Sequence, residues 1–473
     1  MLTDPTHRDP LPWLAEILWP DGSTDIELDG PAEPRWWASP SPSDPRILVP
    51  ATAPAAARAA VRRYHDGFDT RLRLRSLAAE AIVGLGPLAG ATLRRYQVAA
   101  HHRSEVRSGL LDGIANLLGI DDLVVAASLS VPKSNRKPVL QLLDRSGTCH
   151  GWAKVAWNEP TERLVANEAA WLAAEPTPPL SIPRLLHDTE IAGHRVFIAS
   201  AVPPARLPRR RRTRPPGPDL FLSVAAMGTP ELVSIKESLW WRSVESVIEH
   251  ATPRERLAMQ AAVEACYRLR IRTGAWHGDL TPWNLMTAGG RHHLIDWEFA
   301  ADGVPLGFDL CHFHTQVAAE LRGLDAVAAL DHSARLSPHG LARIGIEPQN
   351  RTAVWQLYLV ELLRRLIVLR AEGYPVDGVT FGPAALDRLE RAQGAGRSAI
   401  APASSAPSPV SDTGPVAPPP PAPVPAATPE PAPPAGIEPI VVEFDDLLPV
   451  DPLAGEVTRA GRPPKVGNPN HGR

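Results

Sequence analysis

Residues 276–298 read WHGDLTPWNLMTAGGRHHLIDWE, and this stretch decides the fold of the chain. It places one carboxylate, Asp279, in a loop, an amide, Asn284, shortly after it, and a second carboxylate, Asp296, at the end of an apolar strand. The residues at 288–290 (Ala-Gly-Gly) predict a tight turn between two short strands. The sequence therefore predicts a hairpin that brings two carboxylates and an amide into one site.

These three polar residues have the chemistry that phosphoryl transfer requires. Its catalysis depends mostly on positioning the reactants and neutralising the charge of nucleotide phosphates. Asp279 can accept the proton of an attacking hydroxyl, and Asn284 and Asp296 offer the hard oxygen ligands that Mg²⁺ takes. The plainer alternative is that both carboxylates only cap loops or form salt bridges.

The motif HGDLTPWN followed by IDWE resembles the aminoglycoside phosphotransferase and choline kinase family, a small-molecule branch of the protein-kinase-like fold. The resemblance implies that Asp279 is the catalytic base, that Asn284 and Asp296 bind metal, and that His277 supports the loop structurally. In the later segment PLGFDL, it implies that Asp309 is a buried aspartate that ties down the loop backbone. A simple helix cap is the alternative for Asp309.

The same resemblance calls for a lysine on the third strand and a helix glutamate that orients it. Lys154, in the alternating stretch GWAKVAW, is the best candidate, and Glu168 lies on the helix expected at Glu162–Ala174. Lys133 and Lys137 are weaker candidates because they lie in the preceding turn. A surface lysine and a solvated glutamate are the plain alternatives.

The turn SVPKSNRKPV contains no glycine, so it departs from the glycine-rich phosphate loop of protein kinases. Ser134 and Asn135 could supply the contacts of this turn to the nucleotide, and ATP and GTP both remain open as donors. Gly278 stands where protein kinases have arginine, and few residues separate Asp296 from Asp309. Both features favour a small-molecule kinase over a protein kinase.

The chain-wide pattern predicts a two-lobed, protein-kinase-like α+β fold. Short apolar runs from Leu123 onward predict an antiparallel sheet with one helix, and the second half is mainly helical in pattern. The expected divisions are an accessory, partly helical N-terminal region (1–120), an N-lobe (121–205), a C-lobe with the catalytic loop (206–395) and a disordered Ala/Pro-rich tail (396–473).

Several local signals refine this expectation. Residues 55–118 read as mostly helical, from apolar residues every three or four positions. Thr252, Pro253 and Glu255 predict a capped helix that continues to the catalytic loop, with Leu257 among its apolar residues. A second long helix is expected at Val354–Arg370.

Composition limits the partners and the compartment. Lys plus Arg (49) nearly balance Asp plus Glu (52), so neither nucleic acid nor an anionic membrane is expected as a partner. Three cysteines are too few for a disulfide framework, and no stretch is apolar enough to cross a bilayer, so a cytoplasmic protein is expected. Fifteen prolines between 401 and 440 predict a disordered tail, in which 437–450 could dock a protein partner or be inert.

Other polar features allow less specific readings. Glu298 and Asp302 could bind an amine or sugar hydroxyls, although loop acids are more often solvated. Four histidines could bind zinc, although scattered histidines without a metal are the plainer alternative: His292, His293, His312 and His314. The arginines 209–212 and 214 could bind phosphate or nucleic acid, although a solvated loop is the plainer alternative.

Two functions follow from this reading. The favoured one is a Mg²⁺- and ATP- or GTP-dependent phosphotransferase acting on a hydroxyl of a sugar, an aminoglycoside-like compound or an amino alcohol. The alternative is a pseudokinase-like scaffold that binds nucleotide and recruits partners. The presence of Asp279, Asn284 and Asp296 together favours the enzyme, because a scaffold has no chemical need for all three.

Overall fold

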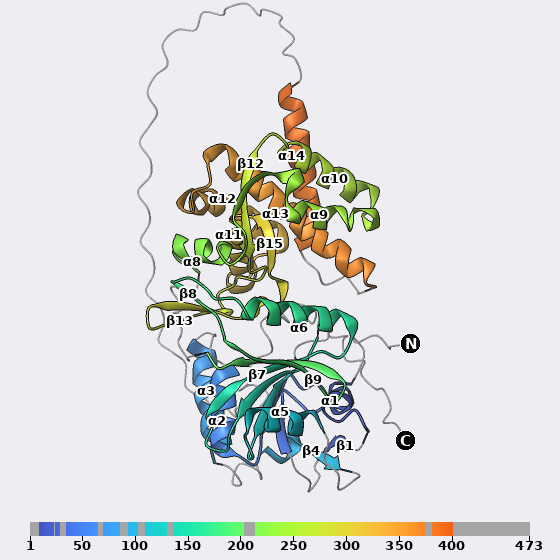
Figure 1. Cartoon of the computed structure of the whole chain (residues 1–473), viewed down its shortest axis with the longest axis vertical. Coiled ribbons are helices and arrows are strands. Elements are labelled where there is room, and N and C mark those ends of the chain that lie inside the picture. Colours follow the sequence, from blue (N-terminus) through green and yellow to red (C-terminus); the bar gives the residue numbers. More distant parts are fainter. Residues whose placement is uncertain are drawn as a thin grey trace, which may run out of the picture.

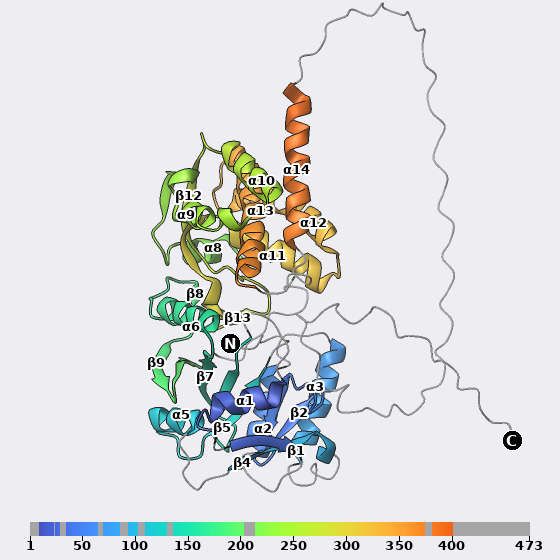
Figure 2. The same ribbon diagram turned by 90° about the vertical axis from the view of Figure 1, so that its right-hand side faces the viewer.

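The computed structural model describes residues 9–22, 24–28, 35–64, 70–85, 93–102, 109–129, 136–202, 213–373 and 381–400. Figures 1 and 2 show two lobes stacked along the long axis, the N-lobe (9–202) built on a sheet and the C-lobe (213–400) mainly helical. Helix α6 (Glu159–Leu172) lies between the sheet and the C-lobe in both views. The two-lobed α+β architecture expected from the sequence is thus confirmed.

The N-lobe is built on one nine-stranded sheet in which every neighbouring pair is antiparallel. Its spatial order is β1 (Thr24–Leu28), β4 (Gln97–His102), β2 (Arg35–Ser39), β3 (Ile47–Pro50), β5 (Val124–Ser128), β6 (Val139–Leu143), β7 (Cys149–Val155), β10 (His194–Ser200) and β9 (Leu185–Ile191). The predicted meander from β5 to β7 is confirmed.

The sheet runs without a break across the boundary expected near residue 120. The first 120 residues, expected to be partly helical with residues 55–118 mostly so, supply four of the nine strands. Strands β1 to β4 are only four to six residues long. Their alternation of apolar and polar residues is therefore too short to be recognised beside the longer helical periodicity of α2 and α3. The N-terminal region is therefore part of the same sheet.

Neighbouring residues of each strand enter two different cores, as strand geometry requires. Trp36 packs in a cluster with α1 (Pro10–Leu18) and α5 (Leu110–Leu118), whereas Trp37 packs with α2 (Pro54–Tyr64) and α3 (Thr70–Val83). We call these the α1 face and the α2 face of the sheet.

Helix α6 begins where its sequence provides a cap. The Asn158 side chain accepts a hydrogen bond from the Thr161 backbone N–H at 3.0 Å, and Pro160 lies in the first turn. The helix begins three residues before the expected Glu162 and includes Glu168, which is buried. Its placement directs Glu168 toward the strand that carries Lys154.

The C-lobe combines helices with two small sheets. One sheet has the order β11 (Glu231–Ser234), β12 (Arg270–Trp276), β15 (Ala301–Pro305). In the other, β13 (Leu285–Ala288) and β14 (Arg291–Leu294) are joined by β8 (Leu180–Ser181), a strand from the N-lobe part of the chain. The hairpin β13–β14 confirms the turn predicted at 288–290. The main helices are α8 (Pro218–Ala225), α9 (Leu239–Glu245), α10 (Pro253–Glu264), α11 (Phe308–Gln316), α12 (Ala326–Arg343), α13 (Pro348–Ala371) and α14 (Phe381–Ile400).

The predicted start of α10 is confirmed, but its predicted continuation to the catalytic loop is wrong. Thr252 and Glu255 form the reciprocal capping box. The helix ends at Glu264, and Leu257 is 63% exposed. Strand β12, the middle strand of its sheet, leads into the loop instead: Arg270 and Arg272 are exposed, whereas Ile271 and the residues from Thr273 onward are buried.

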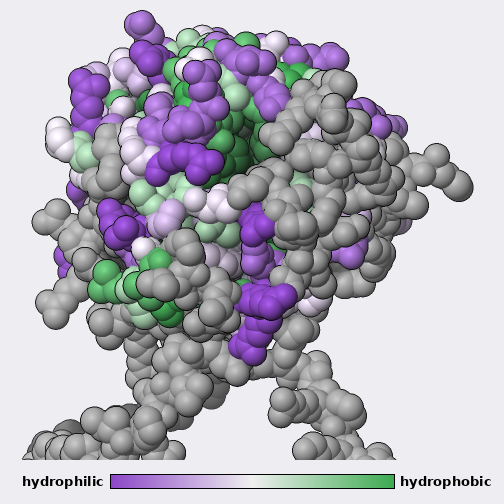
Figure 3. All heavy atoms as spheres, turned by 90° about the horizontal axis from the view of Figure 1, so that it is seen from below, coloured by the Kyte–Doolittle hydropathy of each residue, from purple (hydrophilic) through white to green (hydrophobic). Residues whose placement is uncertain are grey.

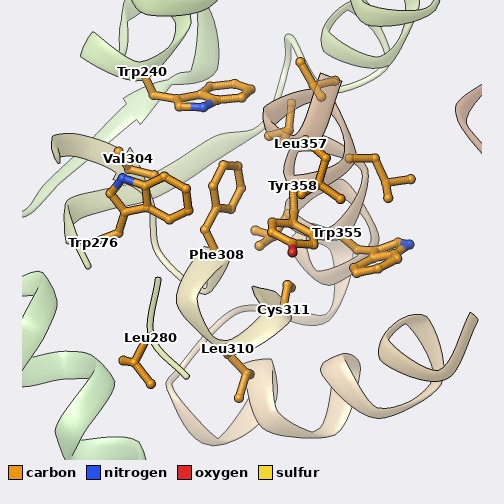
Figure 4. Packing of buried hydrophobic residues seen from close by; sticks show 14 of the residues in the cluster. Trp240, Trp276, Leu280, Val304, Phe308, Leu310, Cys311, Trp355, Leu357 and Tyr358 are labelled. Carbon is orange, nitrogen blue, oxygen red and sulfur yellow. The ribbon is translucent and has the colours of Figure 1, made fainter. Parts of the chain in front are cut away.

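Aromatic packing anchors the C-lobe core around Phe308 (Figure 4). Its ring meets Trp240, Trp276 and Tyr358 edge to face, at centroid distances of 5.4, 5.7 and 5.9 Å. Such pairs contribute about 1 kcal/mol each beyond area burial. Phe308 therefore fixes the first turn of α11, which carries Asp309 toward the catalytic loop.

The predicted helix at Val354–Arg370 is confirmed within α13, whose apolar side is buried. None of the described helices is both long and apolar enough to cross a membrane. Figure 3, seen from the N-lobe end, shows hydrophilic residues interspersed with smaller hydrophobic groups. The expected docking segment 437–450, with the rest of the tail from 401, lies outside the described residues.

Candidate active site

The loop that follows β12 is held at its backbone by Asp309. The Asp309 carboxylate accepts the N–H groups of His277 at 2.9 Å and of Gly278 at 3.1 Å. Burial raises the pKa of Asp309 to about 7, although these two N–H groups act against the rise. Gly278 has φ +82°, and a Cβ there would lie 2.3 Å from the Phe299 carbonyl oxygen, so no side chain fits.

His277 links the loop to the end of β14. Its Nδ1 accepts the backbone N–H of Asp279 at 3.1 Å, so Nε2 carries the proton and donates to the Ile295 carbonyl at 3.0 Å. Its ring also packs edge to face on Trp297 at 4.7 Å. Burial lowers the pKa of His277 to about 4, which keeps the imidazole neutral and suits a supporting role.

Asp279 is oriented through both carboxylate oxygens. Asn284 Nδ2 donates to Asp279 Oδ2 at 2.9 Å and to the Asp279 carbonyl at 3.0 Å. His312 Nε2 lies 3.0 Å from Asp279 Oδ1, and His312 Nδ1 lies 3.2 Å from the Tyr358 hydroxyl. The sequence reading missed this contact, although His312 lies three residues after Asp309 and so on the same side of α11.

Lys154 joins strand β7 to α6 and to the segment after β14. Its ammonium lies 2.5 Å from Glu168 Oε2, contacts Asp296 Oδ1 and lies 3.6 Å from Glu298 Oε2. Burial alone would lower the pKa of Lys154, but the three carboxylates raise it well above its usual value. Lys154 and Asp296, which are 142 positions apart in the sequence, are thus in direct contact.

Two of the carboxylates beside Lys154, Asp296 and Glu168, have pKa values shifted in opposite directions. Burial would raise the pKa of Asp296, yet Lys154 and Lys137 hold it below its usual range. Burial raises the pKa of Glu168 to about 7, and Lys154 only partly offsets this rise. Asp296 therefore keeps its charge across the physiological pH range.

Two residues read from sequence as loop acids have other partners. Glu298 is buried and forms an ion pair with Lys137, which the sequence reading placed second to Lys154. Asp302 accepts the backbone N–H groups of Thr229 at 2.9 Å and of Gly303 at 2.7 Å. Glu298 is therefore not the solvated loop acid that the sequence favoured, because its carboxylate is buried and paired inside the protein.

The donor atoms at this site suit a hard divalent ion. Glu168, Asp296 and Glu298 have carboxylate oxygens within 4.8 Å of one another, and no histidine belongs to such a group among the described residues. The amide nitrogen of Asn284 faces Asp279, so its carbonyl oxygen is the atom left to serve as a ligand. Carboxylate and amide oxygens are the ligands that Mg²⁺ prefers, whereas zinc sites usually include histidine or cysteine.

A cavity of about 370 Å³ lies between the α2 face of the sheet and the β13–β14 hairpin. Four candidate site residues line it: Lys154, Glu168, Asn284 and Asp296. Apolar side chains, among them Phe197, Leu172 and Met286, supply much of the remaining wall. A planar base and a charged phosphate chain need this combination of surfaces.

Some predicted contacts cannot be placed. Ser134 and Asn135, expected to touch the nucleotide, lie outside the described residues, as do Lys133 and the arginines 209–212. The described site therefore rests on the catalytic loop, β7, α6 and the segment after β14.

Comparison with known proteins gives one family match and several distant structures. Residues 200–339 match the family model described as the phosphotransferase enzyme family. No curated protein sequence matches the chain. A thermostable mutant of aminoglycoside phosphotransferase APH(4)-Ia, in ternary complex with ADP and hygromycin B, is similar at 15% identity over 60% of this chain and 97% of its own, with a TM-score of 0.38.

Two further solved structures are similarly distant. Choline kinase LicA from Streptococcus pneumoniae shares 13% identity over 60% of this chain and 98% of its own, with a TM-score of 0.39. Macrolide 2'-phosphotransferase MphH from Brachybacterium faecium shares 14% identity over 56% of this chain and 93% of its own, with a TM-score of 0.33.

The family match covers the part of the molecule that carries the catalytic loop. Asp279, Asn284, Asp296 and Asp309 all lie within residues 200–339, whereas Lys154 lies before them. The geometry of this loop and the match agree with the resemblance seen in the sequence. The segment 200–339, which forms much of the C-lobe, is therefore similar to the phosphotransferase enzyme family.

Proposed function

We propose that the chain is a Mg²⁺-dependent kinase that transfers the γ-phosphoryl group of ATP or GTP to a hydroxyl group of a small molecule. The acceptor classes that fit the sequence reading are sugars, aminoglycoside-like compounds and amino alcohols. A cytoplasmic location belongs to the same proposal, supported by the small number of cysteines, three in the whole sequence.

One observation carries the proposal. Asp279 and Asn284 share a hydrogen bond of 2.9 Å, while Asn284 and Asp296 line the same cavity as Lys154 and Glu168. Residues from both lobes thus gather a proton acceptor, two oxygen ligands and a phosphate-binding cation. A nucleotide-binding scaffold would need the lysine and the cavity, but it has no use for a positioned base.

Each residue has a defined task in the proposed reaction. Asp279 accepts the proton of the acceptor hydroxyl while the oxygen of that hydroxyl bonds to the γ-phosphorus. The bond between that phosphorus and the β–γ bridging oxygen breaks, and the nucleoside diphosphate leaves. Lys154, held by Glu168, binds the phosphates of the donor.

The residues also prepare the site for its metal. Asn284 and Asp296 would hold Mg²⁺, which would neutralise charge on the phosphate oxygens. Lys154 preserves the negative charge of Asp296, and Asp309 with His277 keeps the loop in place. The acceptor approaches from the Asp279 side, where the carboxylate retains 24% exposure.

The experiment is a turnover screen with purified protein, Mg²⁺, ATP or GTP and a panel of hydroxylated metabolites. We expect phosphorylation of one acceptor class, and Asp279→Asn should lower kcat by on the order of 10³-fold while the nucleotide Kd stays unchanged. Asp331→Asn, which removes a charge from the same lobe at a surface pair with Arg388, is the matched control.

Nucleotide binding without turnover of any acceptor in the panel would favour the scaffold. Equal turnover by the wild type and Asp279→Asn would contradict the assigned base.

A further inference from the structure

A buried ion pair ties the two lobes together beside the candidate site. Lys137, just before β6 in the N-lobe, pairs with Glu298 of the C-lobe, and their side chains are 6% and 5% exposed. The same Glu298 oxygen lies 3.6 Å from Lys154. The position of Lys137 therefore affects how the lobes meet and how charge is distributed around Lys154.

The residue before Lys137 points to the opposite face of the sheet. Arg136 is 1% exposed, and its guanidinium lies 4.4 Å above the ring of Trp13 in α1. This opposite placement of neighbours follows from extended backbone, in which consecutive side chains alternate. Movement of one of the two side chains must then be passed to the other through their shared peptide.

The burial of Arg136 depends heavily on α1. Its Nε donates to the Leu129 carbonyl at 3.1 Å, whereas Nη1 and Nη2 have no hydrogen-bond partner among the described residues. A buried guanidinium without such partners carries a large desolvation cost, and burial lowers the pKa of Arg136 to about 10. The Trp13 ring offsets part of that cost through a desolvated cation–π contact.

A second aromatic side chain holds the backbone of Arg136. Trp157 Nε1 donates to the Arg136 carbonyl at 2.7 Å. Trp157 also packs edge to face on Trp13, with ring centroids 5.7 Å apart. Trp13 thus supports both the side chain of Arg136 and the tryptophan that fixes its carbonyl.

We propose that helix α1 is a brace for the nucleotide site: through Trp13 and Arg136, it positions Lys137 to close the two lobes over the bound nucleotide. Figure 2 shows α1 against the sheet of the N-lobe, and its cluster occupies the face opposite the cavity. The brace gives the N-terminal region a role in the reaction without any contact to the reactants. This inference rests on the proposed function, since it concerns the same nucleotide site.

The test compares two tryptophans of the same core. Trp13→Leu removes the stack on Arg136, while Trp36→Leu removes a tryptophan that is 3% exposed in the same cluster. We expect Trp13→Leu to raise the Kd for Mg·ATP by about tenfold, because a desolvated cation–π contact is lost. The acceptor KM should stay unchanged. Trp36→Leu should leave both constants unchanged.

Lys137→Met separates a brace from general destabilisation. Alone it should raise the Kd as much as Trp13→Leu, and the double variant should bind no more weakly than Lys137→Met, because both act through one contact. Arg136→Met, which keeps much of the side-chain volume, repeats the test if Trp13→Leu does not fold. Additive effects of Trp13→Leu and Lys137→Met, or equal effects at Trp13 and Trp36, would overturn the proposal.

Amide hydrogen exchange of residues 136–143 in the nucleotide-free protein gives a readout that needs no ligand. Trp13→Leu should speed exchange in this segment, whereas Trp36→Leu should not. If the wild type binds no nucleotide, the proposed function fails and this exchange result alone decides whether the brace exists. Unchanged exchange in Trp13→Leu would reject the brace even if the enzyme is active.

Discussion

Two buried ionic clusters among the described residues differ in the origin of their members. The interlobe cluster joins Lys137, Lys154 and Glu168 of the N-lobe to Asp296 and Glu298 of the C-lobe. In the helix cluster, by contrast, α13 supplies every charge: Glu361, Arg364 and Arg365, with Trp240 Nε1 donating to Glu361 at 2.9 Å.

The difference shows how buried charge can serve function or structure. In the helix cluster, two guanidinium groups satisfy one fully buried carboxylate, and burial fails to raise the pKa of Glu361 because both arginines hold it at about 2. In the interlobe cluster, three carboxylates surround Lys154. A nucleotide phosphate can therefore replace a carboxylate as the partner of Lys154, and a metal cation can replace Lys154 as the partner of a carboxylate. Arg365 also donates to the Gly278 carbonyl at 2.8 Å, which makes the helix cluster a support for the catalytic loop.

The largest effect on stability should come from the helix cluster. Glu361→Leu leaves Arg364, Arg365 and the Trp240 N–H without their acceptor, so the free energy of unfolding should fall by about 3 kcal/mol. Denaturant unfolding measures this loss, with Arg388→Leu at a surface pair as the control. A loss below about 1 kcal/mol would remove the distinction between the clusters.

The interlobe cluster should show the reverse behaviour. Lys154→Met should weaken Mg·ATP binding by on the order of 10²-fold, because a phosphate ligand is lost from a buried site. The free energy of unfolding should fall by less than in Glu361→Leu, since burial raises the pKa of Glu168 so that it can take up a proton when Lys154 is absent, and Lys137 still pairs with Glu298. Calorimetric titration and denaturant unfolding of the same variant measure both, and a large stability loss with unchanged binding would reverse the assignment.

A buried histidine outside both clusters tests burial without an ion pair. Burial lowers the pKa of His314 to about 4. Between pH 6.5 and 4 the unfolded chain binds a proton that the native protein does not, so stability is lost as pH falls through this window. The loss at pH 5 relative to pH 7 should be smaller in His314→Leu than in the wild type by about 2 kcal/mol. Equal pH slopes for the two proteins would show that His314 titrates normally.

The sequence was most informative where spacing is local. The catalytic loop, the β13–β14 hairpin, the capped start of α10 and the helix bearing Glu168 all depend on neighbours within one turn or hairpin. The family resemblance added the candidate pairing of Lys154 with Glu168, which the structure brings within 2.5 Å. Motif and short-range pattern together sufficed for this part of the site.

Contacts that depend on the chain path could not be predicted in this way. Lys137 and Glu298 are 161 residues apart, and no local pattern connects them. Strands β1 to β4 are short and gain their stability from pairing within a large sheet. The sequence pattern of the first 120 residues did not reveal these strands, because its strongest signal is helical. His312 reaches Asp279 from α11, whose first residue, Phe308, packs against Trp276.

The metal dependence of nucleotide binding tests most directly whether Asn284 and Asp296 form one centre with the phosphates. ATP affinity is measured by calorimetric titration with Mg²⁺ and with a chelator, for the wild type, Asp296→Asn and Asn284→Ala. We expect Mg²⁺ to tighten binding to the wild type and to have little effect on either variant. The same Mg²⁺ enhancement in all three proteins, or none in the wild type, would contradict a shared metal and nucleotide site.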